Sequence, residues 1–151
     1  FAHRGASNYA PENTIAAFSL AVQLGADAIE LDAKLSRDGQ VVVIHDQTVD
    51  RTTSASGKVA EMTLAELQKL DAGSHFDVAF KDEPVPTLEQ VFEAVGSQIY
   101  INIEHTLFEA GANDQFTVRI AEKPEEIKEL LEAGFEYVCQ KDTLIFLRKR
   151  K

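Results

Sequence analysis

Four short apolar stretches, each ending in polar or charged side chains, constrain the fold of this chain more than any other feature. The stretches are residues 1–3, 28–32, 41–46 and 99–104. The chemically active side chains at their ends are His3, Arg4, Glu30, Asp32, His45, Asp46 and Glu104. In α/β proteins, catalytic groups gather at the carboxyl ends of strands. The pattern therefore predicts an α/β fold in which these strand ends contribute to one site.

Three segments between the expected strands have the apolar spacing and the capping residues of helices. The first begins after Asn13 or Thr14 and ends at Gly25. The other two cover residues 64–70 and 88–95. Each follows a threonine that has Glu or Gln three positions later, which is the capping-box pattern. We expect a helix at each of the three places.

The connection between the second and third expected strands is short. Eight residues separate 28–32 from 41–46, and they include an Asp-Gly pair at 38–39. A parallel crossover usually needs about a dozen residues or more, whereas a hairpin fits this length and this turn signal. Spacing alone therefore predicts an antiparallel pair. That pair would place the carboxylates of the second strand and His45 at opposite ends, unless residues 34–40 run back along the strand.

The character of the chain changes near residue 106. Residues 1–105 carry 7 Lys/Arg and 16 Asp/Glu, a net charge of −9, whereas residues 106–151 carry 8 and 9, a net charge of −1. Residues 106–115 are expected to form a linker. Residues 116–151 are expected to form a β-α-β-β segment, namely strand 116–121, helix 124–133 and a hairpin of 135–139 with 143–147. This segment does not continue the rhythm of the first part, which suggests a grafted origin.

Composition argues against several classes of protein. The net charge of −10 disfavours nucleic acid as a partner, because phosphate contacts need clustered cations. The basic end, residues 148–151, is expected to be solvated, with an anion-binding or nucleic-acid-binding patch as the alternative. No apolar run approaches about 18 residues, so no membrane span is expected, and no signal peptide is visible. Without a membrane span we expect a soluble protein, and because the chain opens on Phe1 inside a strand, its localisation cannot be read from the sequence. The single cysteine, Cys139, excludes an intrachain disulfide and is expected to be buried.

Carboxylates at the strand ends suit a metal site. Glu30 and Asp32 alternate along one strand and so face the same way, and a divalent cation would relieve their repulsion. Glu104 would supply a third ligand, and Mg²⁺ and Ca²⁺ fit equally well. The plainer alternative is that the Glu-x-Asp pattern is structural or solvated, but the other strand ends carry chemically complementary groups.

The remaining groups suit proton transfer and phosphate binding. His3 and His45 can act as a general acid and a general base, because imidazole titrates near neutrality. Arg4 offers a planar fork that matches phosphate oxygens. Asp46 would orient His45 or shape the loop after it. Together with a metal, these groups suit phosphodiester hydrolysis. His75 and His105 are given no role.

An ordered set of motifs in this chain closely resembles the glycerophosphodiester phosphodiesterases. The motifs are His3-Arg4-Gly5, Pro11-Glu12-Asn13-Thr14, Glu30-Leu31-Asp32, His45-Asp46 followed by Asp50-Arg51-Thr52-Thr53, Leu70-Asp71-Ala72-Gly73, Pro86-Thr87-Leu88 and Ile101-Asn102-Ile103-Glu104. The resemblance covers about residues 1–105 and leaves 106–151 unmatched. It implies a TIM-type β/α barrel, of which residues 1–105 would be half, with a small insertion over about 47–84. It also implies that the second and third strands run parallel without a helix between them.

Carried over by position, the resemblance implies Glu30, Asp32 and Glu104 as metal ligands, His3 and His45 as the acid/base pair, and Arg4 at the phosphate. A substrate glycerol hydroxyl would attack phosphorus, and water would then open the cyclic phosphate. The implied activity is metal-dependent hydrolysis of small-molecule glycerophosphodiesters to an alcohol and glycerol 3-phosphate, a reaction of lipid metabolism.

Two features depart from the family pattern. The family usually has a lysine two residues after the last glutamate, where this chain has Thr106. The second half of the barrel is also unmatched. The alternative interpretation is therefore a catalytically inactive half-barrel remnant, or a chimera, that folds or self-associates without turnover. Half a barrel leaves open edges, so a homo-oligomer is expected.

Overall fold

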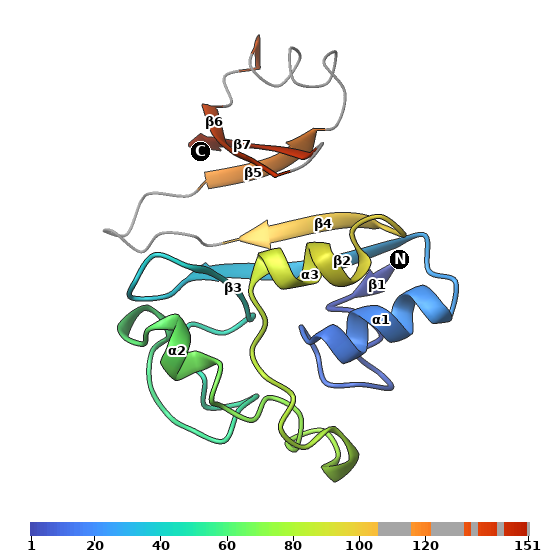
Figure 1. The fold of residues 1–151 in the computed structure, drawn as a ribbon, viewed down its shortest axis with the longest axis vertical. Helices are drawn as coiled ribbons and strands as arrows, with labels where there is room; N and C mark the ends of the chain where they lie inside the picture. Colours follow the sequence, from blue (N-terminus) through green and yellow to red (C-terminus); the bar gives the residue numbers. More distant parts are fainter. Residues whose placement is uncertain (106–115, 122–131, 134–135, 142–143, 151) are drawn as a thin grey trace. The chain divides into compact units, whose positions relative to one another are not determined.

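The computed structural model describes residues 1–105, 116–121, 132–133, 136–141 and 144–150 (Figure 1). Its elements in chain order are β1 (Ala2–His3), α1 (Ile15–Gln23), β2 (Ala28–Leu35), β3 (Val41–Val43), the 3₁₀ helix η1 (Val59–Glu61), α2 (Leu64–Leu67), the 3₁₀ helix η2 (Val78–Phe80), α3 (Leu88–Val95), β4 (Tyr100–His105), β5 (Phe116–Ala121), β6 (Glu136–Lys141) and β7 (Leu144–Arg150). The chain divides into two compact units, Phe1–Asn102 and Ile103–Lys151, and the division falls inside β4.

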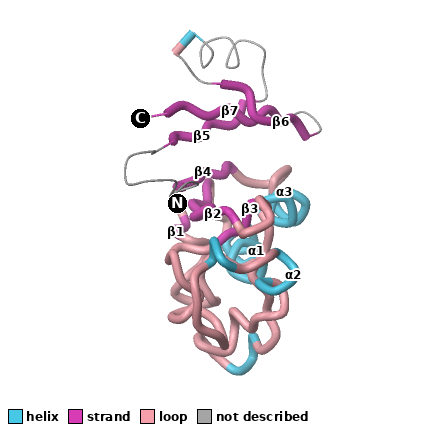
Figure 2. Tube along the Cα trace, turned by 90° about the vertical axis from the view of Figure 1, so that its left-hand side faces the viewer, coloured by secondary structure: helices cyan, strands magenta, loops and turns pink. Residues whose placement is uncertain are grey.

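The first sheet is organised around β2, which pairs with β1, β3 and β4. β1 runs parallel to β2, with His3 opposite Glu30. Helices α1 and α3 pack against each other on one face of this sheet, as Figures 1 and 2 show from two directions. Residues 29–33 of β2 are all buried, including both carboxylates. The fold is therefore α/β, and its central strand carries the acidic residues.

The pairing of β2 with β3 confirms the prediction from spacing and corrects the one from resemblance. The two strands are antiparallel, with Ala33 opposite Val43, so the implied parallel arrangement is wrong. β2 extends beyond Asp32 before it turns, and the hairpin therefore brings the chain back toward the carboxylates. The Ile44 N–H donates a hydrogen bond to the Asp32 carbonyl oxygen at 2.9 Å. His45 follows directly, so an antiparallel pair places it near the carboxylates and not at the far end.

A compact turn closes this hairpin. Gly39 has φ +78°, a conformation that glycine adopts without strain. The Ser36 hydroxyl donates to Asp38 Oδ1 at 2.6 Å, and the Gly39 N–H donates to the Ser36 carbonyl oxygen at 3.0 Å. The Asp-Gly signal in the sequence thus corresponds to a real turn, because its side-chain and backbone contacts are local.

All three expected helices are present, and each begins at a predicted cap. Thr14 accepts a hydrogen bond from the Ala17 N–H at the start of α1. Thr63 and Thr87 each form a complete capping box at the starts of α2 and α3. α2 is shorter than expected and ends at Leu67. In the described residues, no helix has the length and apolar character needed to cross a membrane.

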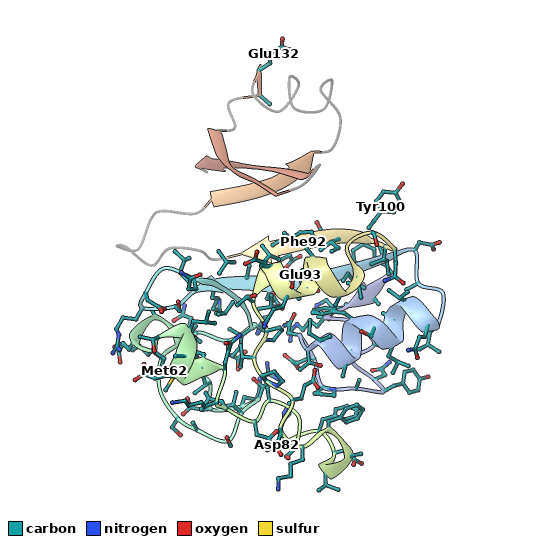
Figure 3. All side chains as sticks on the ribbon, in the orientation of Figure 1. Met62, Asp82, Phe92, Glu93, Tyr100 and Glu132 are labelled. Atoms are coloured by element: carbon teal, nitrogen blue, oxygen red, sulfur yellow. The ribbon has the colours of Figure 1, made fainter. Side chains whose placement is uncertain are left out.

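The expected insertion, residues 47–84, contributes four of the seven buried residues of an apolar cluster within the first unit. The buried residues of this cluster are Val42, Ile44, Val49, Val59, Leu67, Ala72 and Val85. Met62, labelled in Figure 3, packs against it. Val42 lies in β3, and Ile44 is the residue directly after this strand. The cluster therefore anchors the chain on both sides of His45, which fixes the loop that carries this histidine.

The second unit contains a three-stranded sheet in the order β5-β7-β6. β5 and β6 both pair antiparallel with β7, so the predicted strand 116–121 and the predicted hairpin are confirmed. β7 continues to Arg150, whereas we expected the strand to end at residue 147. The helix expected over 124–133 lies almost wholly outside the described residues, as do the linker 106–115 and the side chain of Cys139.

Candidate active site and metal centre

The turn after β1 has a strained backbone that directs it at β2. Arg4 has φ +57° and Gly5 has φ +81°. A Cβ at Gly5 would lie 2.7 Å from the Ala17 Cβ and 2.9 Å from its carbonyl oxygen, so only glycine fits against α1. The turn aims the Arg4 N–H at Glu30 Oε2, to which it donates at 3.1 Å. The His-Arg-Gly motif therefore places the turn in close contact with both helix α1 and the central strand β2.

His3 lies at the solvent side of the same carboxylate. Its Nε2 is 3.6 Å from Glu30 Oε2, and its side chain is 66% exposed whereas that of Glu30 is 3% exposed. An exposed imidazole beside a buried carboxylate can exchange protons with a bound molecule while staying anchored on one side. This arrangement suits a general acid or base at the edge of a site.

Three carboxylates converge on the neighbouring strands. One oxygen each from Glu30, Asp32 and Glu104 lies within 4.8 Å of the other two. Glu30 and Asp32 are buried on β2, and Glu104 is exposed on β4, which pairs with β2. Hard divalent cations take oxygen ligands, and three carboxylates at this spacing match such an ion. The residues present therefore fit a divalent metal, as the sequence predicts.

Asp32 is also bound by two groups from the loop between β1 and α1. The Asn13 side-chain amide donates to Asp32 Oδ2 at 2.9 Å, and the Asp32 N–H donates to Asn13 Oδ1 at 3.3 Å. Arg4 Nε lies 3.2 Å from the same Oδ2. Asn13 has φ +58°, and its N–H donates to the Arg4 carbonyl oxygen at 3.0 Å. These contacts fix the rotamer of Asp32 and keep Arg4 beside the carboxylates.

His45 is held by the residue that follows it in the chain, Asp46. Its Nδ1 lies 2.6 Å from Asp46 Oδ1, and the His45 side chain is 43% exposed. His45 also lines a small pocket with Glu12, Asn13 and Thr52. The loop after β1 and the loop after β3 therefore meet at this pocket, which supports the prediction that the strand ends share one site.

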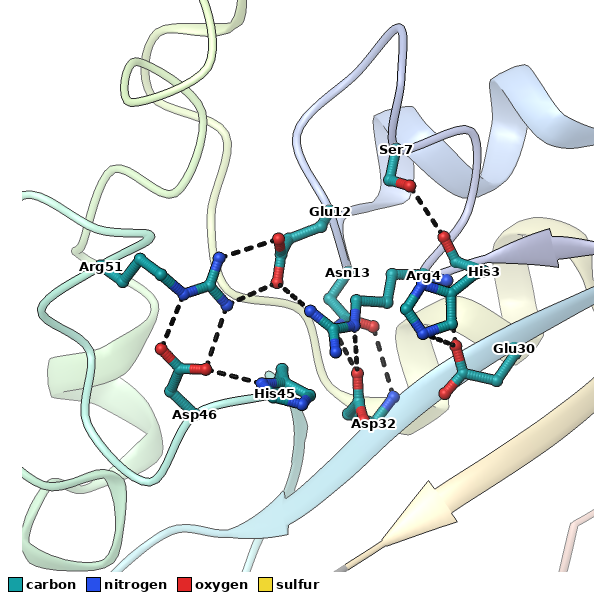
Figure 4. Close-up of polar contacts among 10 residues, drawn as sticks. All are labelled: His3, Arg4, Ser7, Glu12, Asn13, Glu30, Asp32, His45, Asp46 and Arg51. Atoms are coloured by element: carbon teal, nitrogen blue, oxygen red, sulfur yellow. Dashed lines mark hydrogen bonds and ion pairs between the residues drawn. The ribbon is translucent and has the colours of Figure 1, made fainter.

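A second arginine bridges these two loops (Figure 4). Arg51 donates to Asp46 through Nε at 2.8 Å and through Nη2 at 3.0 Å. It also donates to Glu12 through Nη1 at 2.9 Å and through Nη2 at 2.8 Å. Arg4 Nη1 donates to Glu12 Oε1 at 3.1 Å. The contacts form a continuous chain from His45 to Asp32.

The ion pairs of this chain shift the pKa values of its members. Hydrogen bonds from Arg51, followed by one from His45, hold the pKa of Asp46 far below its usual range. Hydrogen bonds from Arg51 also lower the pKa of Glu12, against the opposing effect of burial. Glu12 and Asp46 in turn raise the pKa of Arg51. All three groups are therefore charged at neutral pH.

The structure brings most of the predicted site residues together. His3, Arg4, Glu30, Asp32 and Glu104 surround the carboxylate cluster, and His45 with Asp46 joins them through Arg51 and Glu12. His75 is exposed in the insertion, and Thr106 lies outside the described residues. From the sequence, Glu12 and Arg51 had no expected role, and Asn13 was considered only as a helix cap, not as part of the site. All three belong to quoted motifs, and these motifs were the signal that could have found them.

A family profile and relatives with known names are similar to this chain in sequence. A profile of the glycerophosphoryl diester phosphodiesterase family matches residues 3–148, a range that extends beyond the motifs in residues 1–105. A glycerophosphodiester phosphodiesterase of Caldanaerobacter subterraneus is 57% identical to this chain over 104 residues, which are 68% of this chain and 43% of the relative.

Solved structures with similar folds give a consistent result. A glycerophosphodiester phosphodiesterase from Agrobacterium tumefaciens is 49% identical with a TM-score of 0.67, over 69% of this chain and 45% of the other. An Oleispira antarctica phosphodiesterase, solved in complex with the product sn-glycerol-3-phosphate, is 41% identical with a TM-score of 0.70, over 72% and 44%. This chain thus spans less than half the length of each of these relatives.

Proposed function

Because the chain belongs to the glycerophosphoryl diester phosphodiesterase family, we propose that it hydrolyses glycerophosphodiesters to an alcohol and glycerol 3-phosphate. The observation that carries this proposal is the convergence of Glu30, Asp32 and Glu104 beside His3 and Arg4. Relatives that match this chain are named for that reaction, and one similar structure was solved with the product sn-glycerol-3-phosphate.

Glu30, Asp32 and Glu104 would hold one divalent cation, Mg²⁺ or Ca²⁺. When bound, such a cation supplies Lewis acidity at the phosphoryl oxygens and offsets the repulsion among the carboxylates. Asn13 keeps Asp32 in its observed rotamer through the two hydrogen bonds described above. Arg4, whose side chain is 19% exposed, provides a fixed positive charge for the phosphate beside this cluster.

His3 and His45 would form the acid/base pair. One imidazole would take the proton from the glycerol hydroxyl that attacks phosphorus, and the other would protonate the departing alcohol. Water then opens the cyclic phosphate, with the two roles exchanged. The exposure of both histidines allows each to reach a bound substrate and to return its proton to solvent.

We also infer the architecture that would complete the site. Residues 1–105 would be the first part of a TIM-type barrel, with residues 47–84 as its insertion, because this chain covers only 44–45% of the two similar solved chains. Residues 106–115 would be a linker and 116–151 a β-α-β-β segment; the family profile extends to residue 148, which counts against a grafted origin for this segment. The alternative is a chain that folds without turnover, because residues 1–105 do not supply substrate contacts that the unmatched part of the relatives would make.

The decisive experiment measures glycerol 3-phosphate released from glycerophosphocholine. The native chain is assayed with Mg²⁺, with Ca²⁺ and with a chelator, beside His3→Ala and Glu30→Gln. Glu61→Gln is the matched control, because the Glu61 side chain is 69% exposed and pairs with Lys58 at the surface, at 3.2 Å. We expect metal-dependent turnover that His3→Ala and Glu30→Gln abolish and Glu61→Gln retains. Absence of turnover from the folded chain with either metal would refute the proposal and favour the inactive alternative.

Self-association is a further part of the proposal. Open edges of a partial barrel expose unpaired strand groups that another chain can cover. Sedimentation velocity at micromolar concentration should show a dimer or larger species. A monomer across the concentration range would contradict this expectation.

A further inference from the structure

The contact that the proposed chemistry leaves unexplained is the double fork of Arg51. Its guanidinium makes four hydrogen bonds, two to Asp46 and two to Glu12, all between 2.8 and 3.0 Å. The Arg51 side chain is nevertheless 48% exposed. An exposed arginine gains little stability from a single surface ion pair. Two bidentate pairs instead fix geometry, because the planar fork allows few orientations of its partners.

The two carboxylates that Arg51 binds each contact a different group of the proposed site. Asp46 Oδ1 lies 2.6 Å from His45 Nδ1, and Glu12 Oε1 accepts from Arg4 Nη1 at 3.1 Å. Arg51 and Asp46 lie on the loop after β3, whereas Glu12 lies on the loop before α1. Figure 4 shows this chain of contacts, with Arg51 between the two carboxylates. Arg51 is therefore linked to His45 through one side chain, that of Asp46, and to Arg4 through another, that of Glu12.

We propose that Arg51 is a positioning residue that orients His45 through Asp46 and Arg4 through Glu12. The proposal rests on the hydrolysis proposed above. Within the described part of the chain, the Arg51 guanidinium bonds to Asp46 and Glu12 and not to either histidine or to the three carboxylates of the metal cluster, so its role is to fix the distance between the proton-transfer group and the phosphate-binding group. A 1 Å displacement of either group is enough to reduce a rate substantially.

The orientation of His45 has a specific chemical consequence. Asp46 receives two hydrogen bonds from Arg51 and is ionised, so it can only accept a hydrogen bond from the imidazole. His45 therefore carries its proton on Nδ1, and Nε2 is the atom that gives or takes a proton at the substrate. A carboxylate that fixes a histidine tautomer in this way is a known device of acid/base sites. Here the carboxylate is itself fixed by Arg51.

The orientation of Arg4 has a separate consequence. Glu12 holds Nη1, and Asp32 lies beside Nε, so the guanidinium is fixed on two sides. Arg51 keeps Glu12 in place by occupying both of its oxygens. We call the contacts Arg51–Glu12–Arg4 the Arg4 arm and the contacts Arg51–Asp46–His45 the His45 arm. Weakening the Arg4 arm should reduce the affinity for the phosphate group and so raise KM. Weakening the His45 arm should reduce the rate of proton transfer and so lower kcat.

The test uses four variants of the full chain. Arg51→Lys keeps the charge but cannot make two forks, Asp46→Asn disrupts the His45 arm, and Glu12→Gln disrupts the Arg4 arm. Arg37→Lys is the matched control, because Arg37 is a surface arginine paired with Glu66 at 3.3 Å. We expect Asp46→Asn to lower kcat by about 10- to 100-fold, the size typical of outer-sphere partners, and Glu12→Gln mainly to raise KM. Arg51→Lys should do both, and Arg37→Lys neither.

A spectroscopic readout separates this proposal from the proposed activity. Long-range ¹H–¹⁵N correlations of the neutral His45 ring report which nitrogen carries the proton. We expect the Nδ1–H form in the native chain and in Arg37→Lys, and a mixture of both forms in Arg51→Lys and Asp46→Asn. If the native chain shows no turnover, the hydrolysis proposal fails, but the tautomer measurement still decides the role of Arg51.

The outcomes that would overturn the proposal are clear. Native nitrogen shifts for His45 in a folded Arg51→Lys chain would show that Arg51 does not position the histidine. Unchanged kcat and KM in the same active variant would do so as well. Should Arg51→Lys fail to fold by circular dichroism, Asp46→Asn and Glu12→Gln decide the question, because a shared loss of both parameters in each would contradict two separate arms.

Discussion

Occupation of the carboxylate cluster should stabilise the fold by an amount that can be worked out in advance. At a spacing of 4.8 Å and an effective dielectric constant of about 20, two carboxylates repel by about 3 kcal/mol. Arg4 and His3 offset part of this repulsion, and solvent reduces it further at the exposed Glu104. A cation bound only to the folded chain at 100 times its Kd adds about 2.7 kcal/mol of stability. For a chain of this size, that corresponds to a rise in Tm of about 5–10 °C.

Glu104→Gln separates this effect from general stabilisation by salt. The substitution removes one ligand and two of the three repulsive pairs while keeping the size of the side chain. Without metal, its Tm should equal or exceed that of the native chain. With Mg²⁺ or Ca²⁺, its rise in Tm should fall below about 2 °C at the concentration that gives the full native shift. Glu61→Gln, at an exposed surface pair, should retain the native response.

Differential scanning fluorimetry with a metal titration is the assay, and circular dichroism confirms that each variant is folded. A rise in Tm of equal size in Glu104→Gln and in the native chain would refute the reasoning, because the cation would then bind elsewhere. No rise in the native chain with either millimolar metal would refute it as well, since the three carboxylates would not form a functional cation site.

Two further predictions concern the network and the turn. Asp46 and Glu12 have pKa values below those of the unfolded chain, so the unfolded chain binds more protons as the pH falls through about 4. Their stabilising contribution is therefore complete above about pH 5 and is lost in acid. The urea midpoint should fall less between pH 7 and pH 3 in Arg51→Gln than in the native chain. An equal fall in both proteins would show that the ion pairs of Arg51 do not cause the loss of stability in acid. Gly5→Ala should lower the free energy of unfolding in urea by about 2 kcal/mol more than Gly25→Ala does. Both glycines have positive φ, but only Gly5 faces a close contact, with Ala17. Equal losses in the two variants would show that the contact with Ala17 is easily relieved.

Local features of the fold followed from the sequence. Thr63 and Thr87 were predicted as caps, and Thr14 was one of two candidates with Asn13; all three threonines act as caps, because a cap depends only on residues within one helical turn. The turn at Asp38-Gly39 was predicted for the same reason. The end of the second strand was placed too early, at Asp32, because nothing local distinguishes a buried strand from its extension into a hairpin.

That one boundary changed the interpretation of the site. With the strand ended at Asp32, an antiparallel partner seemed to carry His45 away from the carboxylates. With the strand extended into the hairpin, the same antiparallel partner brings His45 back to them. The resemblance implied a parallel pair and was wrong on this point, although it identified the same candidate residues. Pairing direction depends on the hydrogen-bond register, which motif order does not record.

The sequence by itself determined the family, the α/β class, the helix starts and the chemical types of the site residues. These properties depend on residue identity and on spacing along a few turns of chain. Only the tertiary structure decided which charges meet. Glu12 and Arg51 are separated by 38 intervening residues yet share two hydrogen bonds, and Asn13 reaches Asp32 across the loop before α1. Hydrogen bonds are specified by distances of about 3 Å in space, and those distances exist only after the helices, the hairpin and the insertion have packed.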